Sequence, residues 1–180
     1  MHWTEQEYLA MENESPIKHE YSGGEVFAMA GARPSHNRVA TNTSGALVNL
    51  ARRGNCGAFN SDQRIYIPAT GLHTYADGGL VCGKWQIHTD GMCLLNPVVL
   101  VEVLSPSTRE YDAGAKRGHY EQIPSLRHLL LIDQPERLVR HCLRQADGGW
   151  ESREFTGGEI ELNDLGGSLV LDEIYPAGEL

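Results

Sequence analysis

The sequence of 180 residues lacks the features that mark a secreted, membrane or zinc-finger protein. Its four cysteines are scattered, form no C-x-x-C pair and have no histidine at finger spacing, so structural zinc is not expected. The acidic N-terminal segment has no apolar core of the kind found in secretory leaders. No apolar run reaches the roughly 20 residues that a membrane span requires. We therefore expect reduced thiols and a cytoplasmic protein with no membrane partner.

The composition also argues against a disordered chain. Hydrophobic residues make up 41% of the sequence and charged residues 22%, which is ordinary for globular proteins. A chain of this length buries roughly 70% of its unfolded surface when it folds. We therefore expect residues 1–180 to form a single domain that needs no metal or disulfide for its stability.

An excess of positive charge, which proteins use to neutralise nucleic-acid phosphates, is also absent. Fifteen Lys and Arg stand against 24 Asp and Glu, and the net charge is −9. The acidity lies at the two ends, because residues 1–30 carry −5 and residues 145–180 carry −8, whereas residues 31–144 carry +4. On charge alone, solvated faces are the simpler explanation of the acidic ends. Modest, salt-sensitive DNA binding by the central region stays open, and the candidate basic patch is Arg33, Arg38, Arg52 and Arg53.

Local sequence patterns predict one mixed α/β domain. Segments with the Ser/Thr-x-x-Glu form of a capping box predict helices over 4–11 and 107–123. Apolar residues at helical spacing predict a third helix over 34–53. Apolar or alternating segments bounded by turn residues predict strands and hairpins over 19–29, 57–60, 63–67, 74–81, 97–104, 129–132, 138–143 and 150–155. The rest of the chain is expected to be polar strand and turn.

Glu102 is the most informative residue, because it interrupts an apolar segment that is typical of a strand buried on both faces. A buried charge is costly unless it is paired or bound to a metal. Glu102 is therefore a metal ligand, a general base or the partner of an arginine in a structural salt bridge. Asp77, in the preceding predicted strand, is either a second carboxylate for a hard cation such as Mg²⁺ or a turn residue beside Gly78 and Gly79.

Lys116 lies on the predicted helix that follows Glu102. In a regular helix Asp112, Lys116 and His119 share one face. An ordinary surface ion pair between Asp112 and Lys116 explains this spacing equally well. Two glycines, Gly114 and Gly118, weaken the helix and would permit close packing against the sheet or a ligand.

These residues resemble motifs of a known family. The segment 101–133 resembles the Uma2 family of candidate endonucleases (DUF820), a branch of the PD-(D/E)XK restriction-endonuclease-like superfamily. The likeness covers nearly the whole chain in family order, and 101–133 is its specific part. The matching residues are Val101-Glu102-Val103-Leu104-Ser105-Pro106-Ser107-Thr108, Tyr111-Asp112, Lys116, His119-Tyr120, Ile123-Pro124-Ser125-Leu126, Leu131-Ile132-Asp133, Glu20-Tyr21, Gly24-Glu25-Val26, Met29-Ala30-Gly31, Ser35-His36-Asn37-Arg38, Ser61-Asp62 with Arg64, and Asp172-Glu173-Ile174-Tyr175.

The resemblance implies a mixed central β-sheet flanked by helices, with additional β-hairpins, and a metal-dependent phosphodiesterase site. In that site Asp77, Glu102 and the Val103 carbonyl are the expected ligands of Mg²⁺ or Mn²⁺. The usual lysine, two residues after the acid, is replaced by Leu104, so Lys116 is the expected substitute that orients water or stabilises charge on the phosphate. The residues expected to support the site are Glu20, His36, Asp62, Asp112 and Tyr120. Glu20, His36 and Asp62 are equally explained as cap or turn residues.

One departure from the family pattern bears on activity. Gly78 and Gly79 stand where the family has β-branched residues, and we expect them to loosen Asp77 and weaken metal binding. The first hypothesis is a Mg²⁺- or Mn²⁺-dependent endonuclease acting on DNA, with a homodimer as its expected assembly. The second is an inactive relative that binds nucleic acid or mediates oligomerisation. A glycosidase with two carboxylates is a third, and no sugar-stacking pattern supports it.

Overall fold

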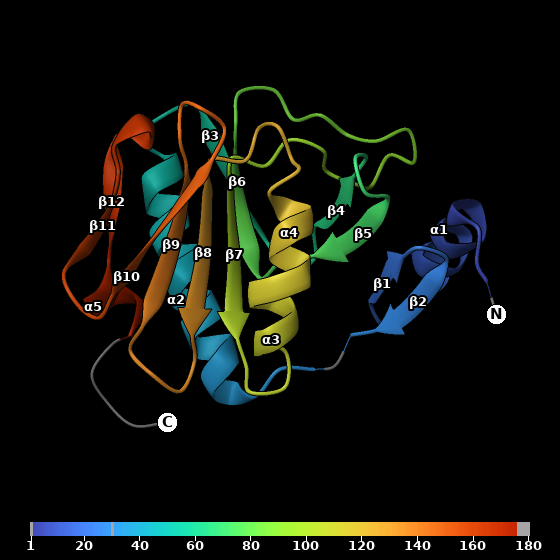
Figure 1. Cartoon of the computed structure of the whole chain (residues 1–180), viewed down its shortest axis with the longest axis horizontal. Coiled ribbons are helices and arrows are strands. Elements are labelled where there is room, and N and C mark those ends of the chain that lie inside the picture. Colours follow the sequence, from blue (N-terminus) through green and yellow to red (C-terminus); the bar gives the residue numbers. More distant parts are fainter. Residues whose placement is uncertain (1, 30, 176–180) are drawn as a thin grey trace.

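A six-stranded mixed sheet forms the centre of the protein (Figure 1). The computed structural model describes residues 2–29 and 31–175. Of the neighbouring pairs in this sheet, β7 and β8 run parallel and the others run antiparallel. The order across the sheet is β10 (Trp150–Phe155), β9 (Val139–Arg144), β8 (His128–Asp133), β7 (Val99–Leu104), β6 (Gly78–Cys82) and β3 (Cys56–Asn60). Every residue of β7 and β8 is buried, as their continuous apolar sequences predict.

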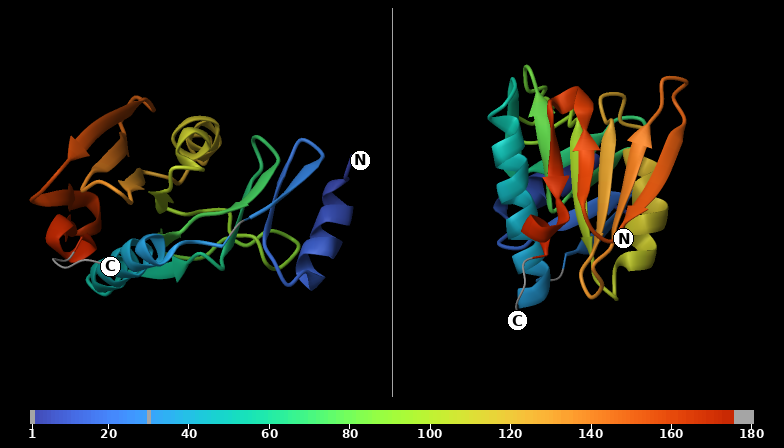
Figure 2. Two further views of the ribbon diagram at one scale, coloured as in Figure 1. Left: turned by 90° about the horizontal axis from the view of Figure 1, so that it is seen from below. Right: turned by 90° about the vertical axis from the view of Figure 1, so that its left-hand side faces the viewer.

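Helices cover the two faces of this sheet (Figure 2). On one face lies α2 (Pro34–Ala51), and its apolar residues form a core with Val101 and Val103 of β7. On the other face lies a continuous helix made of α3 (Arg109–Tyr111), a π-helical turn (Asp112–Lys116) and α4 (Arg117–Tyr120). Side chains alternate along a strand, so Glu102 points to the face that this second helix covers. None of the described helices is long and apolar enough to cross a membrane.

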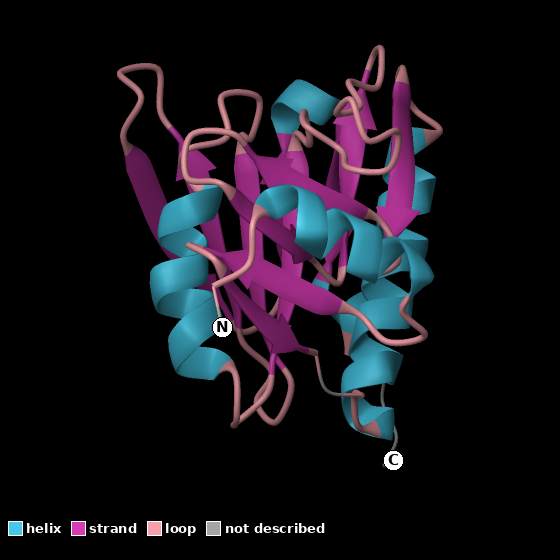
Figure 3. Cartoon of the chain, turned by 90° about the vertical axis from the view of Figure 1, so that its right-hand side faces the viewer, coloured by secondary structure: helices cyan, strands magenta, loops and turns pink. Residues whose placement is uncertain are grey.

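A second, antiparallel sheet of four strands lies beside the first and carries the N-terminal segment (Figure 3). The helix α1 (Glu5–Glu14) begins with the expected capping box, in which Thr4 and Glu7 satisfy each other's backbone N–H groups. It is fixed to the sheet by Tyr8, whose hydroxyl donates to the His19 carbonyl at 2.9 Å. The strands are, in order, β2 (Glu25–Ala28), β1 (His19–Ser22), β5 (Leu72–Tyr75) and β4 (Arg64–Ile67).

The single strand predicted over 74–81 is two strands that belong to different sheets. β5 ends at Tyr75 in the four-stranded sheet, and β6 begins at Gly78 in the six-stranded sheet. Residues Ala76 and Asp77 form the crossing between them. Local propensity does not reveal this break, because each half pairs correctly with its own neighbours. The consequence is that Asp77 lies at the junction of the two sheets rather than inside a strand.

The C-terminal segment, expected to be polar strand and turn, contributes more to the core than its sequence suggested. It forms β11 (Glu159–Leu162), a 3₁₀ turn (Asn163–Leu165), β12 (Gly167–Val170) and α5 (Leu171–Ile174). Five of its apolar residues are fully buried against the α2 face, namely Ile160, Leu162, Leu169, Leu171 and Ile174. The polar appearance of this segment reflects one solvated face of a hairpin.

The expectation of four reduced thiols is wrong for one pair of cysteines. Cys56 and Cys82 stand directly opposite each other on β3 and β6, with Cα atoms 3.9 Å apart, and form a disulfide. Cys93 and Cys142 are buried free thiols. The disulfide joins residues 26 positions apart, and strand pairing that brings them together is not visible in cysteine spacing.

Candidate active site

Lys116 is the centre of a buried cluster of polar groups between the two sheets. Its Nζ lies 3.0 Å from Oε1 of Glu102 and 3.0 Å from Oε1 of Glu20. It also donates to the Tyr75 carbonyl at 3.0 Å and lies 3.8 Å from Oδ1 of Asp112. Burial opposes the charge of Lys116, but the surrounding carboxylates outweigh it and raise the pKa of Lys116 well above its usual value. Lys116 is therefore a fixed ammonium group in a site with only 3% of its side chain exposed.

Glu102 supplies the carboxylate that the strand pattern predicted. Tyr120, from α4, donates its hydroxyl to Glu102 Oε1 at 2.5 Å, and Lys116 contacts the same oxygen. Both contacts therefore fall on Oε1. Burial raises the pKa of Glu102 to about 8, against the opposing attraction of Lys116. The loss of hydration therefore destabilises the ionised carboxylate more than the attraction of Lys116 stabilises it.

Asp77 is held at the junction of the sheets by the backbone of β7. Its N–H donates to the Val101 carbonyl at 2.9 Å, and its Oδ2 accepts the N–H of Val103 at 2.7 Å. The N–H and C=O of one strand residue point to the same neighbour, so the Val103 carbonyl also faces the edge at which Asp77 lies. His36, from the first turn of α2, places Nε2 at 3.4 Å from the same Asp77 oxygen, and the hydrogen bond with Asp77 raises the pKa of His36.

The two glycines that were expected to loosen Asp77 lie in a closely packed strand. Gly78 and Gly79 lie in β6, which is paired with β3 on one side and β7 on the other. A Cβ at Gly79 would come within 2.3 Å of the Val99 carbonyl oxygen and 2.5 Å of the Phe59 ring. The missing side chain is therefore replaced by Phe59, and glycine here permits close strand packing. Asp77 itself is held by two hydrogen bonds with the backbone of β7.

Glu20, Asp112 and Tyr120 join the cluster, and the structure adds two residues to which the sequence analysis assigned no role. Glu20, in β1, accepts the Thr74 hydroxyl on Oε1 and the Tyr111 hydroxyl on Oε2, the latter at 3.0 Å. Both of its oxygens are therefore occupied by donors of the chain. Thr74 is distinguished by neither residue type nor spacing, and Tyr111 appeared only as part of the family motif. Their contacts with Glu20 join segments 54 and 91 residues apart.

Other sequence-predicted residues lie outside the cluster. Asp62 is exposed and pairs with Lys18 at 2.7 Å. His119 is only partly buried, whereas Asp112 and Lys116 are buried. The four arginines proposed as one patch are divided, because the 14 residues between Arg38 and Arg52 in helical geometry span about 21 Å. Arg33 and Arg38 lie near the site end of α2, and Arg52 with Arg53 lies at the other end.

The donors gathered here suit a hard divalent cation. The acids of the cluster, Glu20, Asp77, Glu102 and Asp112, exceed the single ammonium group of Lys116, so their charge favours a cation. Within residues 2–29 and 31–175, no three His, Cys, Asp or Glu side chains are placed to ligate one ion. Mg²⁺ is commonly held by one or two carboxylates, with water and substrate completing its shell. Asp77 and Glu102, with the Val103 carbonyl, fit an ion of this kind by donor chemistry.

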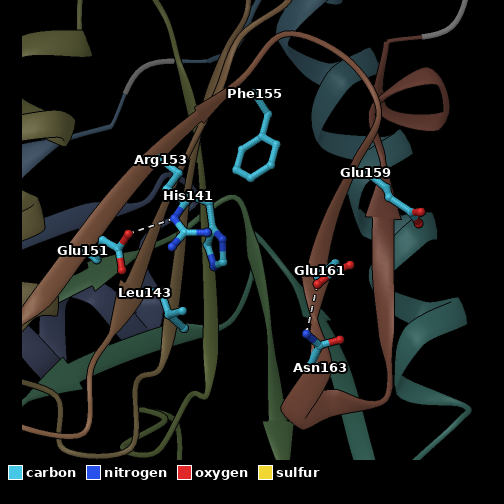
Figure 4. A pocket seen from close by; sticks show the side chains of 8 residues that line it. All are labelled: His141, Leu143, Glu151, Arg153, Phe155, Glu159, Glu161 and Asn163. Carbon is cyan, nitrogen blue, oxygen red and sulfur yellow. Dashed lines mark hydrogen bonds and ion pairs between the residues drawn. The ribbon is translucent and has the colours of Figure 1, made fainter.

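A cavity of about 390 Å³ lies away from this cluster, between β9 and β10 on one side and β11 on the other (Figure 4). Its charged side chains already pair with neighbours, since Arg153 binds Glu151 at 2.8 Å and Asn163 donates to Glu161 at 3.0 Å. None of the predicted site residues lines it. The buried cluster around Lys116 is therefore the better candidate for chemistry.

Comparisons with known proteins agree with this architecture. Residues 5–172 match the Uma2 family, described as "Putative restriction endonuclease". The chain is 32% identical over 171 residues to uncharacterized protein slr1290 of Synechocystis, covering 94% of this chain and 90% of that protein. It is 34% identical over 161 residues to uncharacterized protein sll1609 of the same organism, covering 88% and 90%.

A crystal structure of a "putative nuclease belonging to DUF820" from Anabaena variabilis has the same fold, with a TM-score of 0.75 at 16% identity over 94% of this chain and 96% of that one. The predicted fold class, a restriction-endonuclease-like mixed sheet flanked by helices, is thereby confirmed. The chain belongs to the Uma2 family of nuclease-like proteins.

Proposed function

We propose that this protein is a metal-dependent endonuclease that hydrolyses phosphodiester bonds of DNA. The observation that carries the proposal is the contact between Lys116 Nζ and Glu102 Oε1 at 3.0 Å. The strand position where the superfamily places its lysine is occupied by Leu104. Lys116 reaches the same acid from the following helix, so the pairing of acid and lysine is kept by a different route.

In this proposal the residues divide the work according to their contacts. Asp77 and Glu102, with the Val103 carbonyl, bind Mg²⁺ or Mn²⁺. When bound, the cation polarises the phosphate and makes a bound water a stronger nucleophile. Lys116 stabilises negative charge that builds on the phosphate, because its ammonium group is fixed in a buried site where electrostatic interactions are strong.

The remaining residues of the cluster hold these groups in place. Tyr120 fixes the Glu102 carboxylate, and Glu20 with Asp112 fixes the lysine ammonium. His36 supports Asp77 from α2. Asp62, expected to support the site, has no part in this proposal because it pairs with Lys18 at the surface.

Titration with Mn²⁺ and a cleavage assay test the proposal together. Calorimetry should show Mn²⁺ binding by the wild type and at least tenfold weaker binding by Glu102→Ala and Asp77→Ala, because each variant removes one of two carboxylate ligands. Asp62→Ala is the matched control, since it removes an acid outside the cluster. Supercoiled plasmid and single-stranded DNA with Mg²⁺ should be cleaved by the wild type and by Asp62→Ala. Failure of the wild type to bind Mn²⁺ would contradict the proposal.

The alternative function is an inactive nuclease-like module that binds nucleic acid or mediates oligomerisation. Its support is the closed state of the cluster, in which Glu102 is 4% exposed and Lys116 is 3% exposed. Metal binding without cleavage of either DNA substrate would favour this alternative. Three further properties stay predictions: one domain over residues 1–180, a homodimer and a cytoplasmic location. Sedimentation equilibrium of the purified chain tests the second.

A further inference from the structure

Three hydrogen-bonded side chains link the C-terminal segment to the cavity shown in Figure 4. Asp164, in the 3₁₀ turn after β11, places Oδ1 at 2.9 Å from Nε2 of His128 in β8. Nδ1 of His128 lies 3.0 Å from Nε2 of His141 in the neighbouring strand β9. His128 is 1% exposed and His141 is 5% exposed, and His141 lines the cavity. The carboxylate is therefore linked to the cavity wall through two buried rings.

The acid at one end of this chain of contacts fixes which ring nitrogen carries each proton. Burial lowers the pKa of His128, and burial with the charges of His128 and Arg153 lowers the pKa of His141 to about 4, so both rings are neutral near pH 7. A neutral imidazole donates from one nitrogen and accepts on the other, whereas a carboxylate only accepts. Nε2 of His128 therefore donates to Asp164, and Nδ1 of His128 accepts the Nε2–H of His141. The lone pair of His141 is consequently on Nδ1.

That lone pair is available to a ligand. Nδ1 of His141 accepts no hydrogen bond from the residues that the structure describes, although the side chain is almost wholly buried. On the paired strands β9 and β10, His141 stands opposite Arg153, and both line the cavity. An imidazole that is oriented by a hydrogen bond on one nitrogen presents the other nitrogen to a ligand in a fixed direction. Nδ1 of His141 is therefore a preoriented acceptor at the cavity wall.

The cavity also carries an excess of negative charge. Its lining includes three carboxylates and one guanidinium group, those of Glu151, Glu159, Glu161 and Arg153. Arg153 pairs with Glu151 at 2.8 Å, so these two charges offset each other. Glu161 accepts the neutral amide of Asn163 at 3.0 Å, which leaves the charge of the carboxylate in place. The remaining charge of the lining therefore favours a cation.

We propose that this cavity binds a small organic amine, whose protonated nitrogen donates to Nδ1 of His141 and faces Glu161 on the opposite wall (Figure 4). A protonated amine supplies both a positive charge for the carboxylates and an N–H for the lone pair. Leu143 and Phe155, which also line the cavity, supply apolar surface for the rest of the ligand. The volume of about 390 Å³ lies within the range of small-molecule sites, roughly 300–1,000 Å³. The site is separate from the cluster around Lys116, so its test does not depend on the proposed function.

Two cations of equal charge separate hydrogen bonding from simple charge attraction. Benzylamine is protonated at neutral pH and donates N–H bonds, whereas benzyltrimethylammonium has no N–H to donate. NMR titration of the wild type should give benzylamine a Kd of about 1 mM or below, with amide shifts in β9, β10 and β11. Benzyltrimethylammonium should bind at least about tenfold more weakly, because it cannot make the hydrogen bond to His141. Benzoate, an anion of similar size, should not bind.

The substitution Asp164→Asn tests the position of the proton from outside the cavity lining. Arg127 lies 3.0 Å from Oδ2 of Asp164, so an asparagine keeps its oxygen toward Arg127 and turns its NH₂ toward His128. Each hydrogen bond between the side chains is then reversed, and Nδ1 of His141 carries a proton that repels an ammonium group. The preference for benzylamine should therefore disappear. Glu161→Gln is the control, because it should weaken both cations alike, by up to about fivefold, and keep the preference.

Nitrogen NMR of the wild type gives a measurement that needs no variant. Long-range proton–nitrogen correlation should show Nδ1 of His141 as the unprotonated nitrogen, and its resonance should move when benzylamine is added. A protonated Nδ1 in the wild type, or a failure of benzylamine to bind, would overturn the proposal. Equal binding of the two cations by the wild type, or a preference that persists in folded Asp164→Asn, would do the same. If Asp164→Asn does not fold, the nitrogen resonance and the preference of the wild type decide.

Discussion

Glu102 should make the metal-free protein less stable as the pH rises. Burial raises the pKa of Glu102 to about 8 from an ordinary value of 4.5, against the attraction of Lys116. An acid whose pKa is higher in the folded state than in the unfolded state binds its proton more tightly when folded. The stability linked to that proton is therefore fully present below about pH 4.5 and is lost as the pH rises through about 8.

Replacing Glu102 by glutamine removes the titration while nearly keeping the shape. The glutamine amide oxygen can still accept the Tyr120 hydroxyl, so the packing of α4 on β7 is retained. At about 1.4 kcal/mol per pKa unit, ionisation of Glu102 costs the wild type about 3 to 4 kcal/mol between pH 5 and pH 8. The free energy of unfolding of Glu102→Gln, relative to the wild type, should rise by that amount over the same range.

Urea unfolding in the presence of a chelator at pH 5, 6, 7 and 8 measures this difference. Glu110→Gln, an exposed acid on the same helix, is the control and should show no comparable rise. Saturating Mg²⁺ at pH 8 should restore stability to the wild type and not to Glu102→Gln, because a bound cation favours the ionised carboxylate. A constant difference across this pH range would refute the argument that burial outweighs Lys116.

Three further predictions concern stability. Reducing the Cys56–Cys82 disulfide should lower the free energy of unfolding by about 3.5 kcal/mol, the loop-entropy value for its 26-residue separation, measured by urea unfolding with and without a dithiol reductant. A thiol titration checks the disulfide itself. Protein that is denatured without a reductant should show fewer than the four thiols of the sequence. Gly79→Ala should destabilise the fold by about 2 kcal/mol or more through its clash with Val99 and Phe59, whereas Gly45→Ala, which has open space, should not. Burial and the nearby His128 lower the pKa of His141 to about 4. The free energy of unfolding, measured by urea unfolding, should therefore fall by about 3 kcal/mol from pH 6.5 to pH 4. The fall should be smaller in His141→Gln.

Local signals predicted the parts of the fold that depend on local chemistry. The capping box at Thr4 starts α1, and the apolar segments around Glu102 and Leu131 form the two buried parallel strands. The acid inside such a strand was informative because the cost of burial requires a partner. In the structure the partner is an ammonium group, as the lysine of the resemblance implied, and not an arginine.

What the sequence did not reveal depends on pairing between distant segments. The break at Asp77 arises because the two halves of the segment 74–81 pair with strands of different sheets. The disulfide follows from the register of β3 on β6, and the contacts of Thr74 and Tyr111 follow from the position of Glu20 between them. His119 is only partly buried, and the regular helical period that grouped it with Asp112 and Lys116 is interrupted by a π turn.

The division of charge along the chain is not a division of charge in space, and this sets an expectation for DNA binding. Arginines of the basic central region pair with acids of the C-terminal segment, as in Arg127–Asp164 at 3.0 Å and Arg140–Glu154 at 2.8 Å. Arg33 and Arg38 lie near the site end of α2 and are the nearest candidates for phosphate contacts.

Each phosphate contact adds about −0.9 to the slope of log affinity against log salt, so two contacts predict a slope of about −2. Fluorescence anisotropy of a DNA duplex, measured with Ca²⁺ between about 50 and 300 mM salt, gives this slope. The variant Arg33→Ala should lower the magnitude of the slope by about 1. A slope several units steeper would show that further cationic groups bind DNA. If the proposed function holds, DNA affinity should therefore depend more on the proposed metal ligands than on a basic surface, as the net charge of −9 leads us to expect.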